Sequence, residues 1–178
     1  ISGAVSALSG YCSDSLANTK FGTQALCSNT TGSDNTALGK DSMRVNSSGC
    51  LNTAVGKDAL QVNTTGCFNT ATGVKALGSN TTACQNVALG NEALCSNTTA
   101  NNNNAVGFRT LKSNTTGTNN TGIGNGALHD NTTGACNTAV GSGAIDTNTT
   151  GCLNTSVGYY SLQSNTTANH NTAVGSCG

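Results

Sequence analysis

The sequence predicts an all-β chain folded as a parallel β-solenoid, a β-roll of about ten coils with a 17-residue repeat. The first observation behind this prediction is an asparagine that recurs in every repeat without a slip. Chains with a short fixed period fold as stacks of one repeating unit, because each unit buries its apolar side against its neighbours. The recurring asparagines are Asn18, Asn35, Asn52, Asn69, Asn86, Asn103, Asn120, Asn137, Asn154 and Asn171.

The composition, the second observation, favours a thin core. Of 178 residues, 35% are hydrophobic but only 3% are aromatic. Aromatic side chains supply much of the buried area of a globular core, so we expect a core about one side chain deep. Low charge and low complexity are also typical of disordered chains. The strict spacing of the apolar residues argues against disorder here.

The repeat also defines the domain organisation. It runs without insertion or deletion from Asn18 to Gly178, so residues 18–178 are expected to form a single solenoid domain. Residues 1–17 are expected to add one degenerate N-terminal coil. Helices are disfavoured because Asn, Thr and Gly, which dominate every repeat, are poor helix formers.

Within each coil the residue pattern predicts two short strands. We number the repeat from its asparagine and call equivalent residues of successive coils a column. Columns 4 and 9 are apolar with one exception, Thr72, and are expected to face inward, while column 5 is always Gly and is expected to form a corner. The strands would cover T-A-V and A-L, with N-T-T-G turning the chain back. Coils about 4.8 Å apart would give a rod of roughly 48 Å, with asparagine ladders along its axis.

The repeat carries a family resemblance. The segments N-T-A-V-G, N-T-G-I-G and N-T-S-V-G resemble the head repeats of YadA-like trimeric autotransporter adhesins. The whole N-T-A-V-G-x-x-A-L-x-x-N-T-T-G unit is similar to arrays of bacterial surface proteins and phage tail-fibre-like proteins. The resemblance covers nearly the entire chain. It implies a left-handed β-roll exposed on a cell or virion surface.

The charge pattern excludes several classes of protein. Seven basic and seven acidic residues are scattered singly, so there is no basic stripe for nucleic acid. No apolar run approaches the roughly 20 residues of a membrane span. Asp41 and Asp58 share a column beside Lys40 and Lys57, an arrangement that favours surface charge pairing over acid–base catalysis. We therefore expect no enzyme, no cofactor and no metal site.

Column 12 predicts N-linked glycosylation, because every member is followed two residues later by Thr or Ser. Column 1 provides a comparison, since only Asn154 in that column has this pattern. The alternative is that the Thr pairs suit a turn and the acceptor pattern is incidental. The expected glycosylation sites are Asn29, Asn46, Asn63, Asn80, Asn97, Asn114, Asn131, Asn148 and Asn165.

Nine cysteines without C-x-x-C spacing favour an oxidising, extracellular location with disulfides. The alternative is free thiols that pack as small apolar residues. Cys50 and Cys67 share column 16 in successive coils, within disulfide reach. Cys177 is expected to remain free or to form an intermolecular bond. The other expected pairs are Cys136–Cys152, Cys12–Cys27 and Cys84–Cys95.

These observations predict a structural subunit of a secreted, glycosylated extracellular fibril. The ends show no recognisable cap, so we expect the chain to associate with itself head to tail by strand addition. Glycans or a cell surface are further candidate partners. The first alternative is an adhesin stalk or a phage or viral tail-fibre shaft. The second is an ice-binding solenoid that uses the column 13 threonines Thr30, Thr64, Thr81, Thr98, Thr115, Thr132, Thr149 and Thr166.

Overall fold

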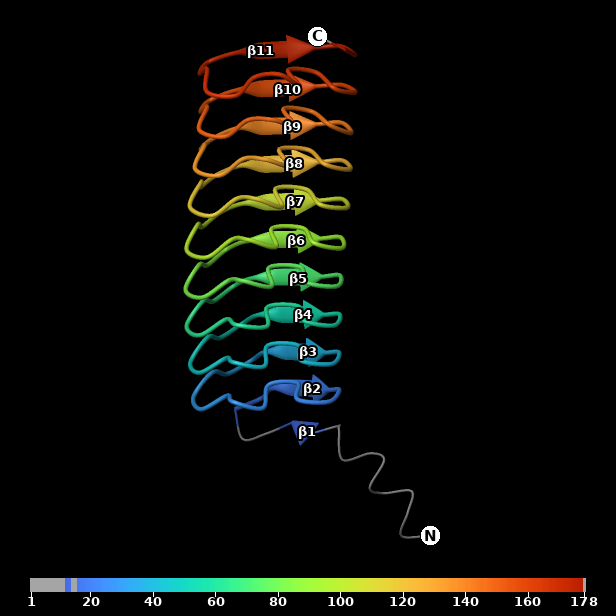
Figure 1. Cartoon of the computed structure of the whole chain (residues 1–178). Helices are drawn as coiled ribbons and strands as arrows, with labels where there is room; N and C mark the ends of the chain where they lie inside the picture. The colour runs from blue at the N-terminus through green and yellow to red at the C-terminus, as the bar shows by residue number, and fades with distance from the viewer. Residues whose placement is uncertain (1–11, 14–15, 178) are drawn as a thin grey trace.

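The structure, a computed structural model, describes residues 12–13 and 16–177, with side chains from residue 16 onward. The described residues form a single 11-stranded sheet and contain no helix (Figure 1). The strands are β1 (Cys12–Ser13), β2 (Thr19–Phe21), β3 (Thr36–Leu38), β4 (Thr53–Val55), β5 (Thr70–Thr72), β6 (Val87–Leu89), β7 (Asn104–Val106), β8 (Thr121–Ile123), β9 (Thr138–Val140), β10 (Thr155–Val157) and β11 (Thr172–Val174).

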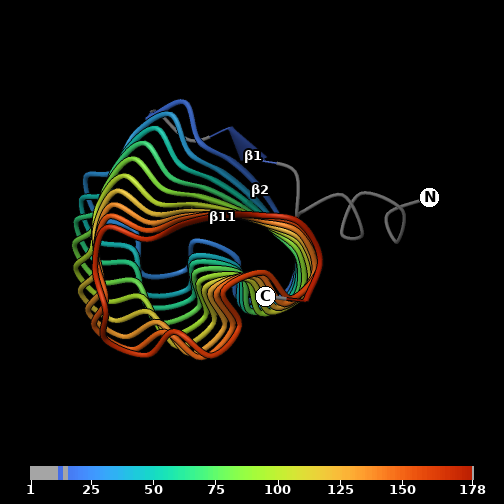
Figure 2. The same ribbon diagram turned by 90° about the horizontal axis from the view of Figure 1, so that it is seen from above.

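Strands β2 to β11 are parallel, and each pairs with the equivalent strand of the neighbouring coil. Thr36 lies opposite Thr53, for example, and Ala37 lies opposite Ala54. Viewed along the axis, the coils lie over one another with nearly the same outline (Figure 2). The predicted parallel β-solenoid is therefore confirmed.

Strand β1 departs from this pattern. It pairs with β2 in the antiparallel direction, with Cys12 opposite Lys20. The part of the expected N-terminal coil that the structure describes is therefore not a copy of the parallel coils. Residues 1–11 and 14–15 of that expected coil lie outside the described residues.

Each coil contains one strand and not the two that we predicted. The A-L segment forms turns: the Ala25 amide donates to the Gly22 carbonyl at 3.2 Å, and Leu26 has a left-handed φ of 48°. A left-handed residue reverses the chain direction and cannot continue an extended strand. Columns 7, 9 and 17 repeat this conformation around the coil, as Asp58, Leu60 and Phe68 show with φ values of 58°, 48° and 61°.

Column 5 is the predicted corner. Its glycines have φ values between 131° and 142°, which L-residues rarely adopt. The coils also approach closely there. A Cβ atom on Gly56 would lie 2.6 Å from the carbonyl oxygen of Gly73 in the next coil.

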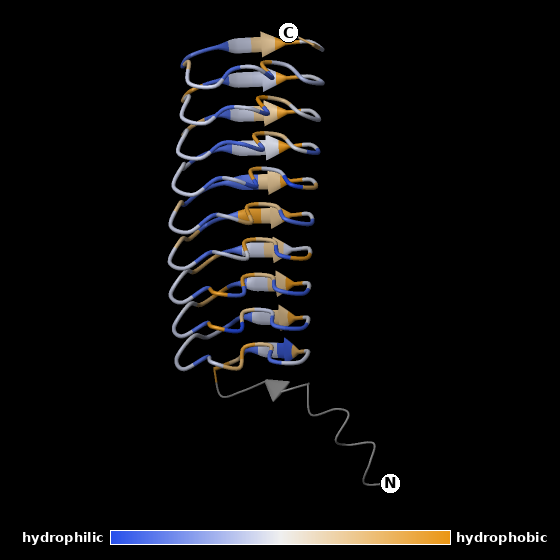
Figure 3. Cartoon of the chain, viewed as in Figure 1, coloured by the Kyte–Doolittle hydropathy of each residue, from blue (hydrophilic) through white to orange (hydrophobic). Residues whose placement is uncertain are grey.

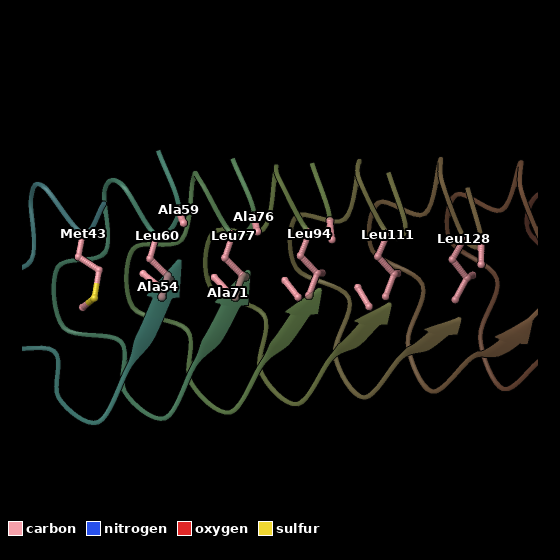
Figure 4. Packing of buried hydrophobic residues seen from close by; sticks show 14 of the residues in the cluster. Met43, Ala54, Ala59, Leu60, Ala71, Ala76, Leu77, Leu94, Leu111 and Leu128 are labelled. Carbon is pink, nitrogen blue, oxygen red and sulfur yellow. The ribbon is translucent and has the colours of Figure 1, made fainter. Parts of the chain in front are cut away.

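The core is formed by columns 3, 8 and 9. The leucine side chains of column 9 reach across the coil toward the alanines of column 3, as Leu60 and Leu77 do beside Ala54 and Ala71 (Figure 4). These four residues are completely buried. Apolar residues consequently recur at the same place in every coil (Figure 3). The inward orientation of column 9 is confirmed.

The predicted inward orientation of column 4 is wrong. Its side chains point outward, and Phe21 and Ile123 are 56% and 43% exposed. Successive residues of a strand point to opposite faces, so columns 3 and 4 cannot both face the core. The small alanines of column 3 occupy the inner face because the facing leucines leave little room.

Candidate functional site

Two asparagine columns are buried inside the stack, and both act as hydrogen-bond ladders. In column 1, the backbone N–H of Asn52 donates to Oδ1 of Asn35 in the preceding coil at 3.0 Å. Its side-chain Nδ2 donates to the carbonyl of Gly66 at 2.8 Å, near the end of the same coil. Column 1 therefore joins neighbouring coils and also closes each coil on itself.

Column 12 forms the second ladder. Nδ2 of Asn63 donates to Oδ1 of Asn46 in the preceding coil and to the carbonyl of Gly66, both at 2.9 Å. Oδ1 of Asn63 accepts from Nδ2 of Asn80 in the next coil at 2.8 Å. The Gly66 carbonyl thus accepts from both asparagine columns.

This geometry overturns the predicted glycosylation. Nδ2 is the atom that would carry the glycan, and in column 12 it is hydrogen-bonded within the coil. Asn29 and Asn165, in the outermost repeats of the column, are half-buried and bonded in the same way, to the Gly32 and Ala168 carbonyls. The folded stack has no space for a sugar at the fully buried members, so the prediction is wrong there. Those members are Asn46, Asn63, Asn80, Asn97, Asn114, Asn131 and Asn148.

The Asn-x-Thr/Ser pattern of columns 12 to 14 instead reflects the turn that these columns form. Column 14, which supplies the hydroxyl residue of the pattern, is exposed in every coil from Thr31 to Thr167. Threonine suits such an exposed turn, as the alternative reading of the sequence proposed. The sequence held one sign of burial: column 12 is as free of substitution as column 1.

The column 16 cysteines form a short sulfur ladder. The Sγ atoms of Cys50 and Cys67 lie 2.9 Å apart, and both thiols are free. Cys67 also accepts a hydrogen bond from the Cys50 amide at 3.1 Å, and Cys84 accepts one from the Cys67 amide at 3.1 Å. The hydrogen bond to Cys67, together with burial, raises the pKa of Cys50 to about 11. Cys50 and Cys67 are thus close enough for the predicted disulfide.

In the structure, the cysteines of the predicted Cys84–Cys95 and Cys136–Cys152 pairs are free thiols. Cys84 donates to the Thr82 carbonyl, whereas Cys95 lines a recess beside Asp58. Cys152 accepts from the Ala135 amide at 3.3 Å and donates to the Thr150 carbonyl at 3.4 Å, and Cys136 is an exposed free thiol.

Three further predicted cysteines lie at the ends of the chain. Cys27 is exposed and lies 3.5 Å from the Arg44 carbonyl. Its predicted partner Cys12 has a side chain outside the described part of the structure. Cys177 is an exposed free thiol.

Charged side chains pair in columns 6, 7 and 10. Glu92 accepts from Arg109 at 2.8 Å and lies 3.0 Å from Lys112. Hydrogen bonds from Lys112 and Arg109 hold the pKa of Glu92 below its usual value. Asp58 lies 3.6 Å from Lys57 and accepts from Gln61 at 2.9 Å. Between residues 16 and 177, no three acidic, histidine or cysteine side chains gather as a metal site would require, and no helix could span a membrane.

The outer face of the sheet is a repeating surface that carries no charge. It consists of columns 2 and 4 from Thr19 to Val174, and none of these residues is charged. The threonine column that we associated with ice binding, column 13, lies elsewhere. Its hydroxyls are used inside the stack, because each from Thr30 to Thr149 donates to the column 13 carbonyl of the next coil.

These features define the class of the protein: a β-solenoid of regularly repeating coils with two internal asparagine ladders and one uncharged outer face. No protein-family model, curated protein or solved structure matches the chain in a comparison with each of these sets.

Proposed function

We propose that this chain is a structural subunit of a secreted fibril in which successive chains stack head to tail. It has no catalytic role in this proposal, and its partner is a second copy of itself. The observation that carries the proposal is the outer edge of β11, which pairs with no other strand among the described residues.

The edge of β11 has the bonding pattern of an interior strand. Inside the stack, the Thr155 amide donates to the Asn171 carbonyl of the next coil at 2.8 Å, and the Gly175 amide donates back to Val157 at 2.9 Å. By the same register, the Thr172 amide and the Val174 carbonyl face away from β10. Val174 is 79% exposed, against 40% for Val157 one coil earlier. Another parallel coil would therefore continue every ladder without new chemistry.

The other end of the stack must rearrange before this joint can form. Strand β1 occupies the outer edge of β2 in the antiparallel direction, whereas the joint requires a parallel coil. Strand β1 must therefore leave β2 before two chains can stack. The two residues of β1 can form only a few backbone hydrogen bonds with β2.

The cysteines support a location outside the cell, and the low surface charge supports association between copies. Two column 16 thiols lie within disulfide reach, and disulfides persist in oxidising compartments. With zero net charge and few ionisable groups, the surface offers little electrostatic repulsion between copies.

Negative-stain electron microscopy of the full chain and of a chain lacking residues 1–17 tests this function. We expect filaments many times longer than the ~48 Å of one stack, forming more readily in the shortened chain. Thr172→Pro in the shortened chain should suppress filaments, because it removes an N–H that faces away from β10. Val174→Thr is the matched control, since Thr72 already occupies this column. Short rods from both chains would reject head-to-tail assembly and favour a stalk or tail-fibre shaft.

A second function, ice binding, is favoured by the uncharged outer face. Column 2 is mostly threonine and column 4 mostly β-branched or aliphatic, and the strands repeat them about every 4.8 Å. Thermal hysteresis of the purified chain tests this function. Thr138→Lys on this face should abolish the hysteresis, whereas Thr133→Lys in exposed column 14 should preserve it. A chain without hysteresis rules the function out.

A further inference from the structure

A recess of about 300 Å³ interrupts one side of the stack. It lies between columns 6 and 7 on one side and column 10 on the other, across the coils that begin at Asn103, Asn120, Asn137 and Asn154. Four coils correspond to about 15 Å along the axis. The recess therefore has the length of a small ligand, and it is larger than the recess of about 200 Å³ that Asp58, Lys75 and Cys95 line in earlier coils.

Two glycines create the recess. Column 7 carries long side chains in the preceding coils, among them Glu92 and Arg109, but glycine at Gly126 and Gly143. No atom lies within 4 Å of the place where a Cβ of Gly126 would be, so this residue forms an open floor. A Cβ on Gly143 would collide with the ring of Tyr160, which shows that this ring lies against the Gly143 backbone.

Aromatic rings stand at both ends of the recess. Tyr160 is held by an edge-to-face contact with Tyr159, with ring centroids 4.4 Å apart and planes at 77°. Phe108, which is 44% exposed, lies at the opposite end. The Arg109 guanidinium lies 4.8 Å from the Phe108 ring centroid. The recess thus offers a fixed flat apolar surface against which a ring-shaped ligand could pack.

Polar groups with unused hydrogen-bonding capacity line the space between these rings. Nδ1 of His129 lies 2.8 Å from Oδ1 of Asp130, which orients the imidazole and leaves Nε2 for another partner. No described residue forms a hydrogen bond with the Asp146 carboxylate or with the side chains of Asn125 and Ser142. His129 and Asp146 occupy column 10 in neighbouring coils. A carboxylate and an imidazole nitrogen are acceptors, so the site calls for a ligand rich in hydroxyl donors.

The charges disfavour an anionic ligand. Arg109, the one cation that lines the recess, is already bound to Glu92 at 2.8 Å. Asp146 lines the recess, and Asp130 lies next to His129, so both add negative charge near the site. Phosphate or a carboxylate would be repelled by these carboxylates, and Glu92 already partly neutralises Arg109. A neutral ligand meets no such cost.

We propose that this recess binds a neutral pyranose sugar. A pyranose combines an apolar C–H face, which would pack on Tyr160, with a rim of hydroxyls, which would donate to Asp146 and His129 and bond with Asn125. The proposal does not rest on the fibril function, because it requires only one folded stack.

Calorimetric titration with methyl α- and β-pyranosides of glucose, galactose and mannose tests the proposal. Gly126→Lys would fill the floor, and column 7 accepts this side chain, because Lys75 has a φ of 58° at the equivalent position. We expect at least one pyranoside to bind, and Gly126→Lys and Tyr160→Ala each to weaken that binding at least tenfold. Asn91→Lys, an exposed column 6 change in another coil, is the matched control.

Circular dichroism establishes that each variant retains the fold, so a loss of binding can be assigned to the recess. Three results would overturn the proposal: no pyranoside binds, Gly126→Lys binds as tightly as the parent chain, or inorganic phosphate or methylammonium binds while no pyranoside does. The filament assay is a separate measurement, so failure of one proposal leaves the other intact.

Discussion

At the residue scale, the amide side chain explains why asparagine occupies both ladders. An interior position such as Asn63 must donate to a carbonyl and to the preceding coil, and must also accept from the next coil. An amide supplies both a donor and an acceptor, whereas an ionised carboxylate only accepts. A column of buried carboxylates would also place like charges about 4.8 Å apart. Among the described residues, no buried side-chain polar atom lacks a hydrogen-bond partner, the ladder asparagines included.

Asn63→Ala tests this role. It removes the donor to Oδ1 of Asn46 and the acceptor for Nδ2 of Asn80, and it leaves buried polar groups unsatisfied. We expect the free energy of unfolding to fall by about 2 kcal/mol, measured by urea denaturation. Asn91→Ala, an exposed asparagine outside the ladders, should change it by less than about 0.5 kcal/mol. If Asn63→Ala and Asn91→Ala changed the free energy of unfolding equally, the ladder would contribute no stability.

Cys50 gives a second prediction at this scale. Its pKa of about 11 keeps the thiol protonated at neutral pH, and only the thiolate reacts with iodoacetamide. Alkylation of Cys50 should therefore be slow at pH 8 and rise about tenfold per pH unit toward pH 11. Mass spectrometry after short alkylation pulses measures this rate, with exposed Cys27 as the internal reference. Equal alkylation rates of Cys50 and Cys27 at pH 8 would show that the pKa of Cys50 is not raised.

At the scale of the coil, the sequence predicts the stacking and the register, because a fixed period leaves one way to place equivalent residues side by side. It does not reveal which face of the strand is buried when both faces carry apolar residues. Column 3 contains only small residues after Lys20, whereas column 4 ranges from Thr72 to Phe21. Uniform small size indicates a tight interior, and variable size indicates an open surface. That signal was present, but hydrophobicity alone favoured column 4.

The sequence also could not predict the recess. The recess depends on what neighbouring coils place beside a residue. Gly126 opens a floor because no side chain from an adjacent coil covers it, whereas Tyr160 covers Gly143. Such differences between coils are small departures from the repeat. A description by columns records what equivalent residues share and therefore misses these differences.

The corner glycines give the prediction at this scale. In Gly56→Ala, a Cβ would lie 2.6 Å from the Gly73 carbonyl oxygen, at a φ of 134°. Strain and backbone collision together should cost about 3 kcal/mol or more, seen as a lower thermal midpoint by circular dichroism. Gly126→Ala is the control, because its φ of 66° is close to that of the non-glycine members of its column and the space around it is open. Its expected cost is only about 1 kcal/mol.

At the scale of the whole molecule, stability is distributed along the axis. Each parallel strand pairs only with the strands before and after it, so the stack behaves approximately as a sum of identical units and joints. Interior coils are interchangeable in this arrangement, whereas the ends are not. The length of a deletion should therefore matter more than its position within the interior.

Deleting residues 86–102 removes one complete coil and joins Gln85 to Asn103, which preserves every column. We expect this chain to fold, with circular dichroism like the parent and a maximum dimension about 5 Å shorter by small-angle scattering. Deleting residues 86–101 instead leaves one extra residue at the joint. To keep the strands paired, that residue must bulge out, or the following strand must slip by one position and turn its alanine column outward. The second chain should therefore melt at a lower temperature although it loses one residue fewer. Equal melting temperatures would mean that the fixed register between coils does not hold the stack together.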